Sequence, residues 1–110
     1  MIHTIKNKCL SLSFNLHGGS MCSIKDVTTG EELQYQPDPR SWSGQDVVIF
    51  PFVARLKGGK YTVDGKEYSM KNHGLCRYND FGVVELKDDE ATIRFSSNEE
   101  TLKEYPYNFI

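Results

Sequence analysis

Apolar and polar residues alternate along much of this chain, and this alternation limits the folds that it can adopt. Between residues 10 and 16 every second residue is apolar, namely Leu10, Leu12, Phe14 and Leu16. A period of two places these side chains on one face of a β-strand. Further along, Asp64-Gly65 separates two short segments, and Asp-Gly is favoured in a type I′ turn because both positions need positive φ. The pattern predicts antiparallel strands joined by tight turns.

The same criteria predict the remaining elements. We expect strands at residues 10–16, 21–27, 31–35, 47–50, 60–63, 66–68, 81–86 and 91–95, and another that begins at residue 107. The apolar run Val47–Phe50 predicts a strand buried on both faces. Residues 36–44 are expected to form a loop in which Trp42 packs as a plug. One short helix is expected over Asn98–Glu104, with Asn98 as its cap. The fold class is therefore all-β with at most one short helix.

Composition limits the size and the partners of the chain. Its 110 residues suit a single domain, although a hydrophobic content of 38% is low for a self-sufficient one. The net charge is −2 and the basic residues are scattered, which argues against nucleic acid and anionic membranes as partners. Apolar runs long enough for a signal peptide or a membrane span are absent.

The cysteines argue against a disulfide scaffold and a metal site. The chain has three, Cys9, Cys22 and Cys76, and no two of them form a Cys-x-x-Cys pair. Reduced thiols in a cytoplasmic protein are the natural interpretation. Cys76 is expected to be a small buried residue rather than a nucleophile, because no histidine is placed to activate it. His3 and His17 are expected to be exposed and without a chemical role.

Two segments carry residues that suit the handling of a sugar. Phe50–Leu56 contains Arg55, and His73–Arg77 begins with a histidine that precedes a glycine. Arginine offers five donors in a planar fork, which can hold several oxygens of a polyol or a carboxylate. Histidine exchanges a proton most readily near neutral pH. Together the two segments indicate half of a sugar-binding site.

From Gly19 to Ile110 the chain resembles the N-terminal part of the aldose 1-epimerases, the galactose mutarotase-like proteins. It is most similar to their bacterial subgroup with unassigned substrates. The matching segments follow one another in the same order and with similar spacing: Ser23–Asp26, Thr29–Glu32, Asp38-Pro39, Trp42, Phe50–Leu56, Tyr61–Tyr68, His73–Arg77, Ser97–Leu102 and Tyr105–Tyr107.

The resemblance implies a fold and an activity. Residues 1–110 would be one domain, the N-terminal part of a large antiparallel β-sandwich. Such proteins bind a free aldose and interconvert its α and β anomers without a cofactor or a metal. In the family a glutamate base takes the proton of the C1 hydroxyl while a histidine acid protonates the ring oxygen, which is general acid–base catalysis.

The resemblance also implies roles for three residues. Arg55 matches the arginine that hydrogen-bonds sugar hydroxyls. His73 matches the first of two active-site histidines, which makes it both a candidate catalytic residue and a candidate substrate-binding one. Arg77 follows a subgroup pattern and is a third substrate-binding candidate. The second histidine and the glutamate base lie beyond the position that matches Ile110, so we expect the 110-residue chain to be inactive by itself.

Two other functions stay open. Tyr107–Ile110 begins an alternating strand and stops within it, so we expect a truncated sandwich with an open sheet edge. The chain could be a non-catalytic carbohydrate-binding domain that keeps Arg55 and His73. It could also be a structural fragment that self-associates through the open edge. The residues do not name the sugar, and Arg55 and Arg77 leave a phosphorylated one open.

Overall fold

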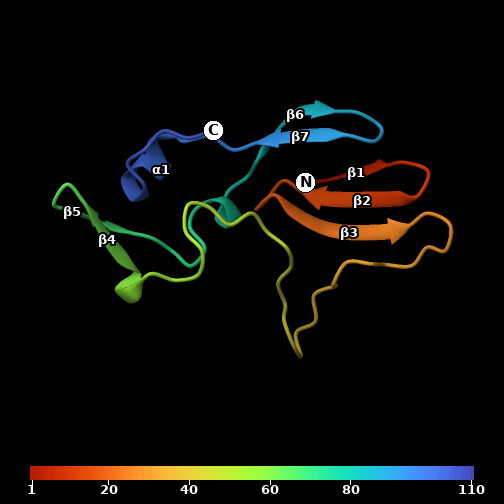
Figure 1. The fold of residues 1–110 in the computed structure, drawn as a ribbon, viewed down its shortest axis with the longest axis horizontal. Coiled ribbons are helices and arrows are strands. Elements are labelled where there is room, and N and C mark those ends of the chain that lie inside the picture. Colours follow the sequence, from red (N-terminus) through yellow and green to blue (C-terminus); the bar gives the residue numbers. More distant parts are fainter.

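The structure is a computed structural model that describes all residues from Met1 to Ile110, and it consists mostly of strands. Figure 1 shows three separate groups of antiparallel strands joined by long loops. The groups are a sheet of β1 (Ile2–Lys6), β2 (Leu10–Asn15) and β3 (Ser20–Asp26), a hairpin of β4 (Lys60–Val63) and β5 (Lys66–Ser69), and a hairpin of β6 (Gly82–Leu86) and β7 (Ala91–Arg94). Two 3-10 turns, η1 (Lys57–Gly59) and η2 (Cys76–Tyr78), and one helix, α1 (Glu99–Glu104), complete the chain. The all-β class with one short helix is confirmed.

The alternating segment at residues 10–16 forms the central strand of the sheet. Strand β2 pairs with β1 from Ile2↔Asn15 to Lys6↔Ser11 and with β3 on its other side. Phe14 points inward and is buried, as the period-two pattern predicts. Strand β1 was not expected, because its apolar residues Ile2 and Ile5 do not follow a strict alternation.

Local turn and cap signals were reliable. Asp64 and Gly65 have φ of 49° and 77° and join β4 to β5, as predicted for a type I′ turn. At α1 the Asn98 side chain accepts a hydrogen bond from the Thr101 N–H at 2.9 Å, and the Thr101 hydroxyl accepts one from the Asn98 N–H at 2.8 Å. This reciprocal pair is a capping box, so the expected helix forms where its cap residue lies.

Three expected strands are absent. Val47–Phe50 was expected to be buried on both faces, but Val48 and Ile49 are 39% and 43% exposed and only Phe50 forms a bridge, to Gly74. In residues 31–35 only Glu32 forms a bridge, because its carboxylate, rather than a backbone carbonyl, accepts the Ile24 N–H at 2.8 Å. Residues 107–110 are not a strand either.

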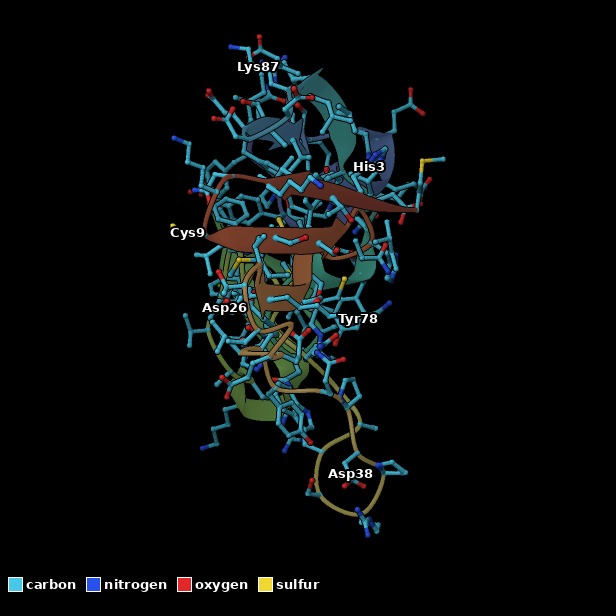
Figure 2. The ribbon with its side chains drawn as sticks, turned by 90° about the vertical axis from the view of Figure 1, so that its right-hand side faces the viewer. His3, Cys9, Asp26, Asp38, Tyr78 and Lys87 are labelled. Atoms are coloured by element: carbon cyan, nitrogen blue, oxygen red, sulfur yellow. The ribbon has the colours of Figure 1, made fainter.

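Trp42 does not act as a plug. It is 55% exposed and stacks on Tyr35, with 5.6 Å between the ring centroids. Figure 2 shows that the loop around Asp38 projects away from the rest of the molecule, so Trp42 has little apolar surface to pack against.

The molecule is a thin, open slab. Its principal extents are 56 × 36 × 17 Å, and only 8 of 110 residues are buried. Four of those eight, Met70, Gly74, Leu75 and Cys76, lie in one seven-residue segment. The best-packed part of the chain is thus the segment that contains His73. The one α-helix has six residues, and no helix is long and apolar enough to cross a membrane.

Candidate functional site

The two segments singled out by the sequence lie side by side. The Phe50 carbonyl accepts hydrogen bonds from the Leu75 N–H at 2.7 Å and the Cys76 N–H at 3.3 Å. Gly74 has a φ of 82°, and a Cβ on it would overlap the carbonyl group of Phe50 and lie 2.7 Å from Cδ of Pro51. Only glycine permits this approach, so Gly74 is what allows the two segments to meet.

A second contact joins Ala54 to His73. The His73 N–H donates to the Ala54 carbonyl at 2.9 Å, and the Ala54 N–H donates to Nδ1 of the His73 ring, also at 2.9 Å. Both residues have positive φ, 61° and 64°, which is rare for residues other than glycine. Such strain persists only where surrounding contacts impose it, and it concentrates at functional sites. The reciprocal pair holds the backbone on both sides of the site.

This contact also determines which nitrogen of His73 carries the proton. A neutral imidazole has one donor and one acceptor nitrogen, and Nδ1 is the acceptor because a backbone N–H points at it. The proton therefore resides on Nε2. The half-buried His73 has no other hydrogen-bond partner, so Nε2–H is free to donate to an oxygen of a ligand.

Arg55 follows Ala54 directly and is exposed. None of the five ion pairs of the chain involves it. Its five donors are therefore available to a ligand, and the reciprocal pair at Ala54 and His73 anchors the backbone that carries them.

Arg77 lies in η2, within the segment that follows His73. Its guanidinium carbon is 5.1 Å from the ring centroid of Tyr78, and Nζ of Lys71 is 5.0 Å from the same centroid. The Tyr78 hydroxyl donates to the Asn72 carbonyl at 3.0 Å, which ties the ring to the His73 turn. The sequence pattern gave no indication of Lys71, Tyr78 or the role of Ala54. Positive φ at an alanine leaves no signal in a sequence.

The remaining candidates have structural roles. Cys76 is 5% exposed and burial raises the pKa of its thiol, so the prediction of a small buried residue is confirmed. All three cysteines are free. His17 is exposed as expected, but its Nδ1 lies 2.7 Å from Oδ1 of Asp80. The expectation of an exposed His3 is wrong: it is half-buried and stacks on Phe14 at 5.7 Å.

The site contains donors but no acid–base partner. No carboxylate forms a hydrogen bond or an ion pair with Arg55, His73 or Arg77. No three His, Cys, Asp or Glu side chains gather as a metal site would require. What the arrangement can do is hold the oxygens of a ligand from one side.

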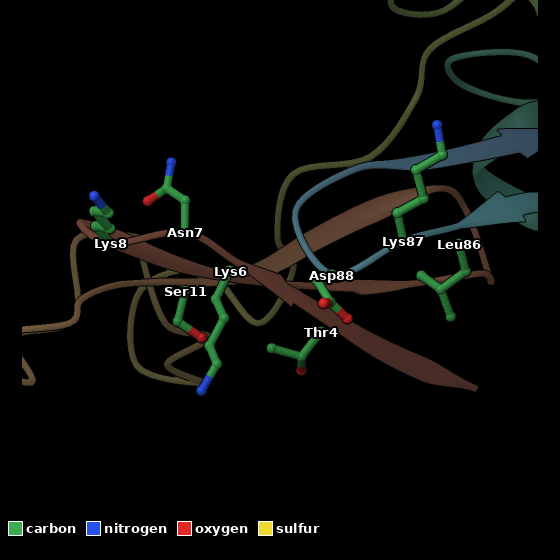
Figure 3. Close-up of a pocket in the computed structure, with 8 residues that line it drawn as sticks. All are labelled: Thr4, Lys6, Asn7, Lys8, Ser11, Leu86, Lys87 and Asp88. Carbon is green, nitrogen blue, oxygen red and sulfur yellow. The ribbon is translucent and has the colours of Figure 1, made fainter.

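The largest hollow of the molecule lies elsewhere, between the β1–β2 hairpin and the turn after β6. It measures about 1020 Å³ and its lining contains neither Arg55 nor His73. Figure 3 shows Asn7 and Lys87 extending to one side and Lys6 and Ser11 to the other. Side chains that point apart do not converge on a ligand, so we do not place the site there.

The comparisons with known proteins all point to one family. A family model described as aldose 1-epimerase matches residues 1–110. The plasmid and chromosomal forms of Protein LacX from Lactococcus lactis subsp. lactis are each 31% identical over 110 residues. These matches cover 96% of this chain and 36% of each relative, so the chain spans about a third of the length of its curated relatives.

Solved structures show the same fold. A galactose mutarotase related enzyme from Lactobacillus acidophilus superposes with a TM-score of 0.94 at 37% identity, over 98% of this chain and 36% of that one. A galactose mutarotase-like protein from Lactobacillus casei gives a TM-score of 0.93 at 26% identity, over 98% of this chain and 37% of that one. The open slab described above therefore matches about a third of each of these longer chains.

Proposed function

The chain belongs to the aldose 1-epimerase family, and on that basis we propose that residues 1–110 form the part of an epimerase-like protein that holds an aldose through Arg55 and His73. The reciprocal hydrogen bonding of Ala54 with His73 carries this proposal, because it leaves the proton of His73 on Nε2 and fixes His73 beside Ala54, the residue that precedes Arg55. A sugar presents hydroxyl oxygens that accept hydrogen bonds from such donors.

The reaction is the interconversion of α and β anomers by general acid–base ring opening. A base takes the C1 hydroxyl proton, an acid protonates the ring oxygen, and the C1–O bond of the ring breaks. Rotation about C1–C2 and reclosure then give the other anomer, and each proton returns. In this scheme His73 holds a sugar oxygen as a neutral donor. The base and the acid are a glutamate and a second histidine that residues 1–110 do not supply.

The proposal includes a partner and a location. The partner is a small-molecule sugar, held without contribution from a cofactor. The location is the cytoplasm, and the three free cysteines support it because thiols stay reduced there.

Exchange and binding of glucose test the proposal together. NMR exchange spectroscopy measures the rate at which α- and β-glucose interconvert, and saturation transfer measures binding. We expect binding by the 110-residue chain without faster exchange. Arg55→Ala and His73→Ala should each weaken binding about tenfold, the loss expected for a hydrogen bond to a charged or well-placed donor. Lys57→Ala is the matched control, since Lys57 is an exposed cation two residues after Arg55.

A chimera tests the proposal even if the 110-residue chain alone binds glucose too weakly to measure. Residues 1–110 replace the matching 36% of the Lactobacillus acidophilus protein, and mutarotation is measured with and without His73→Ala. Faster exchange that the substitution abolishes supports the epimerase reading. Binding without exchange in the chimera would favour a carbohydrate-binding domain. Equal binding by wild type and both variants would refute the site, and concentration-dependent self-association without sugar binding would favour the structural fragment.

A further inference from the structure

One peptide unit of the candidate site is hydrogen-bonded at both of its ends. It links Asn72 to His73, so its carbonyl belongs to Asn72 and its N–H to His73. The Asn72 carbonyl accepts the hydroxyl of Tyr78 at 3.0 Å, and the His73 N–H donates to the Ala54 carbonyl at 2.9 Å. Hydrogen bonds in such a chain polarise one another, so each of these two bonds strengthens the other.

The orientation of this peptide unit sets the backbone conformation of His73. The φ angle of a residue is the rotation about its N–Cα bond, and it therefore depends on how the preceding peptide plane is held. His73 has a φ of 64°, which is rare for residues other than glycine and persists only where neighbouring contacts impose it. The two contacts on the plane are the Ala54 carbonyl at its N–H and the Tyr78 hydroxyl at its carbonyl.

The imidazole ring of His73 depends on the same angle. The His73 N–H and Nδ1 of its ring both bond to Ala54, so the two groups must face the same residue. The angle between them changes with φ, because the N–H and the side chain lie on opposite ends of the N–Cα bond. A rotation of the Asn72–His73 peptide plane would therefore break the bond to Nδ1, and with it the contact that keeps the proton on Nε2.

Tyr78 is fixed independently of its hydroxyl. Its N–H donates to the Leu75 carbonyl at 3.1 Å, within η2. Nζ of Lys71 and Cζ of Arg77 lie 5.0 Å and 5.1 Å from the centroid of its ring, which is the distance of a cation–π contact. The hydroxyl is thus presented to the Asn72 carbonyl by a ring that backbone and side-chain contacts already hold.

From this arrangement we propose that Tyr78 is a positioning residue of the sugar site. Its hydroxyl holds the Asn72–His73 peptide unit and thereby keeps the His73 ring in the orientation that leaves Nε2–H free for a sugar oxygen. The inference rests on the proposed function and adds to it the group that maintains the binding conformation of His73. Tyr78 acts through His73 and need not touch the sugar.

The test replaces Tyr78 by phenylalanine, which removes the hydroxyl and keeps the ring. Amide hydrogen exchange reports how often each backbone hydrogen bond opens. We expect the His73 and Ala54 amides of Tyr78→Phe to exchange about threefold faster than in the wild type, and glucose affinity to fall about threefold, as the loss of one neutral hydrogen bond predicts. The long-range ¹⁵N spectrum should show partial protonation of Nδ1 of His73.

Neighbouring amides separate positioning from a loss of stability. The Leu75 and Cys76 N–H groups both donate to the Phe50 carbonyl, and neither bond involves the Tyr78 hydroxyl. Their exchange should be unchanged in Tyr78→Phe. If these two amides accelerate as much as those of the Ala54–His73 pair, Tyr78 only stabilises the fold and the proposal is overturned.

Tyr35→Phe is the matched control. The Tyr35 hydroxyl also donates to a backbone carbonyl, that of Trp42 at 2.6 Å, but in the loop that projects away from the site. This variant should leave the exchange of the His73 amide and the glucose affinity unchanged. An effect on both equal to that of Tyr78→Phe would overturn the proposal.

The measurements distinguish a failure of this inference from a failure of the proposed function. Unchanged exchange and an unchanged His73 spectrum in Tyr78→Phe would overturn the role of Tyr78 and leave the sugar site intact, and so would an unchanged glucose affinity. If the wild type binds no glucose, the proposed function fails and the role of Tyr78 in it fails as well.

Discussion

At the scale of single residues, two hydrogen bonds donated by backbone N–H groups hold the candidate site together. Ala54 and His73 each adopt positive φ, and each donates its N–H to the other residue. His73 and Arg55 could be predicted from the sequence, because their side chains carry recognisable chemistry. Ala54 could not, because an alanine offers no side-chain signal and its contribution is a backbone N–H.

The protonation of His73 can be observed directly. The long-range ¹⁵N spectrum of the histidine side chains at pH 7.5 should show Nδ1 of His73 as an unprotonated acceptor. His17 provides the internal contrast, because its Nδ1 faces Oδ1 of Asp80 at 2.7 Å and should carry the proton. A His73 ring protonated on Nδ1 would contradict the contact with the Ala54 N–H.

Gly74 should tolerate no side chain. We expect Gly74→Ala to lower the free energy of unfolding by roughly 1–3 kcal/mol, because the new Cβ meets the Phe50 carbonyl group as well as an unfavourable φ. Gly30→Ala separates the two effects, since Gly30 has a φ of 74° but nothing within 4 Å of its Cβ position. Gly30→Ala should lower the free energy of unfolding by less than Gly74→Ala. Equal decreases, measured by chemical denaturation, would argue against the close approach at Gly74.

At the scale of elements, local signals were informative and long-range ones were not. The Asp64-Gly65 turn and the Asn98 cap were predicted because their determinants lie within a few residues. The strands expected at 31–35 and 47–50 do not form, because a strand needs a hydrogen-bonding partner and that partner lies in a distant part of the sequence. Phe50, for example, pairs with Gly74. Apolar content alone predicted burial for Val48 and Ile49, which the described residues leave partly uncovered.

The carboxylate of Glu32 gives the edge of β3 a pH dependence. The Ser23 hydroxyl donates to it at 2.6 Å and the Ile24 N–H at 2.8 Å, and these bonds lower the pKa of Glu32 below its usual value of 4.5, the Ser23 bond most strongly. Its stabilising contribution is therefore complete above pH 4.5 and is lost as the pH falls through the lowered pKa.

Glu32→Gln should flatten the decrease of stability between pH 5 and pH 2, measured by thermal unfolding followed with circular dichroism. Glu31→Gln is the control, because the neighbouring Glu31 carboxylate accepts no hydrogen bond. If both variants keep the pH dependence of the wild type, Glu32 does not act as described.

At the scale of the whole molecule, the chain is more open than a compact domain. Its radius of gyration is 16.7 Å, whereas a compact chain of this length has about 13 Å. A hollow of about 370 Å³ is lined by eight apolar side chains and Arg94; the apolar ones are Val48, Phe50, Cys76, Phe81, Ile93, Phe95, Phe109 and Ile110. A second, smaller hollow also includes Ile93. The modest apolar content of the sequence indicated low burial, but it did not indicate where this exposed apolar surface lies.

This surface should bind an apolar dye. We expect the chain to enhance the fluorescence of 8-anilinonaphthalene-1-sulfonate, because the exposed apolar area is contiguous. Ile93→Asp should reduce the enhancement, since Ile93 lines both hollows. Ile2→Asp should not, because the 60% exposed Ile2 lines neither. Equal enhancement by the two variants would mean that the dye binds elsewhere.

If the Phe50–Leu56 and His73–Arg77 segments together hold the sugar, a ¹H–¹⁵N correlation spectrum recorded during a titration with glucose should show it. We predict shift changes concentrated at the amides of these two segments, with those of Ala54 and His73 among the largest. Changes concentrated around Lys6 and Lys87, in the larger hollow of Figure 3, would contradict it.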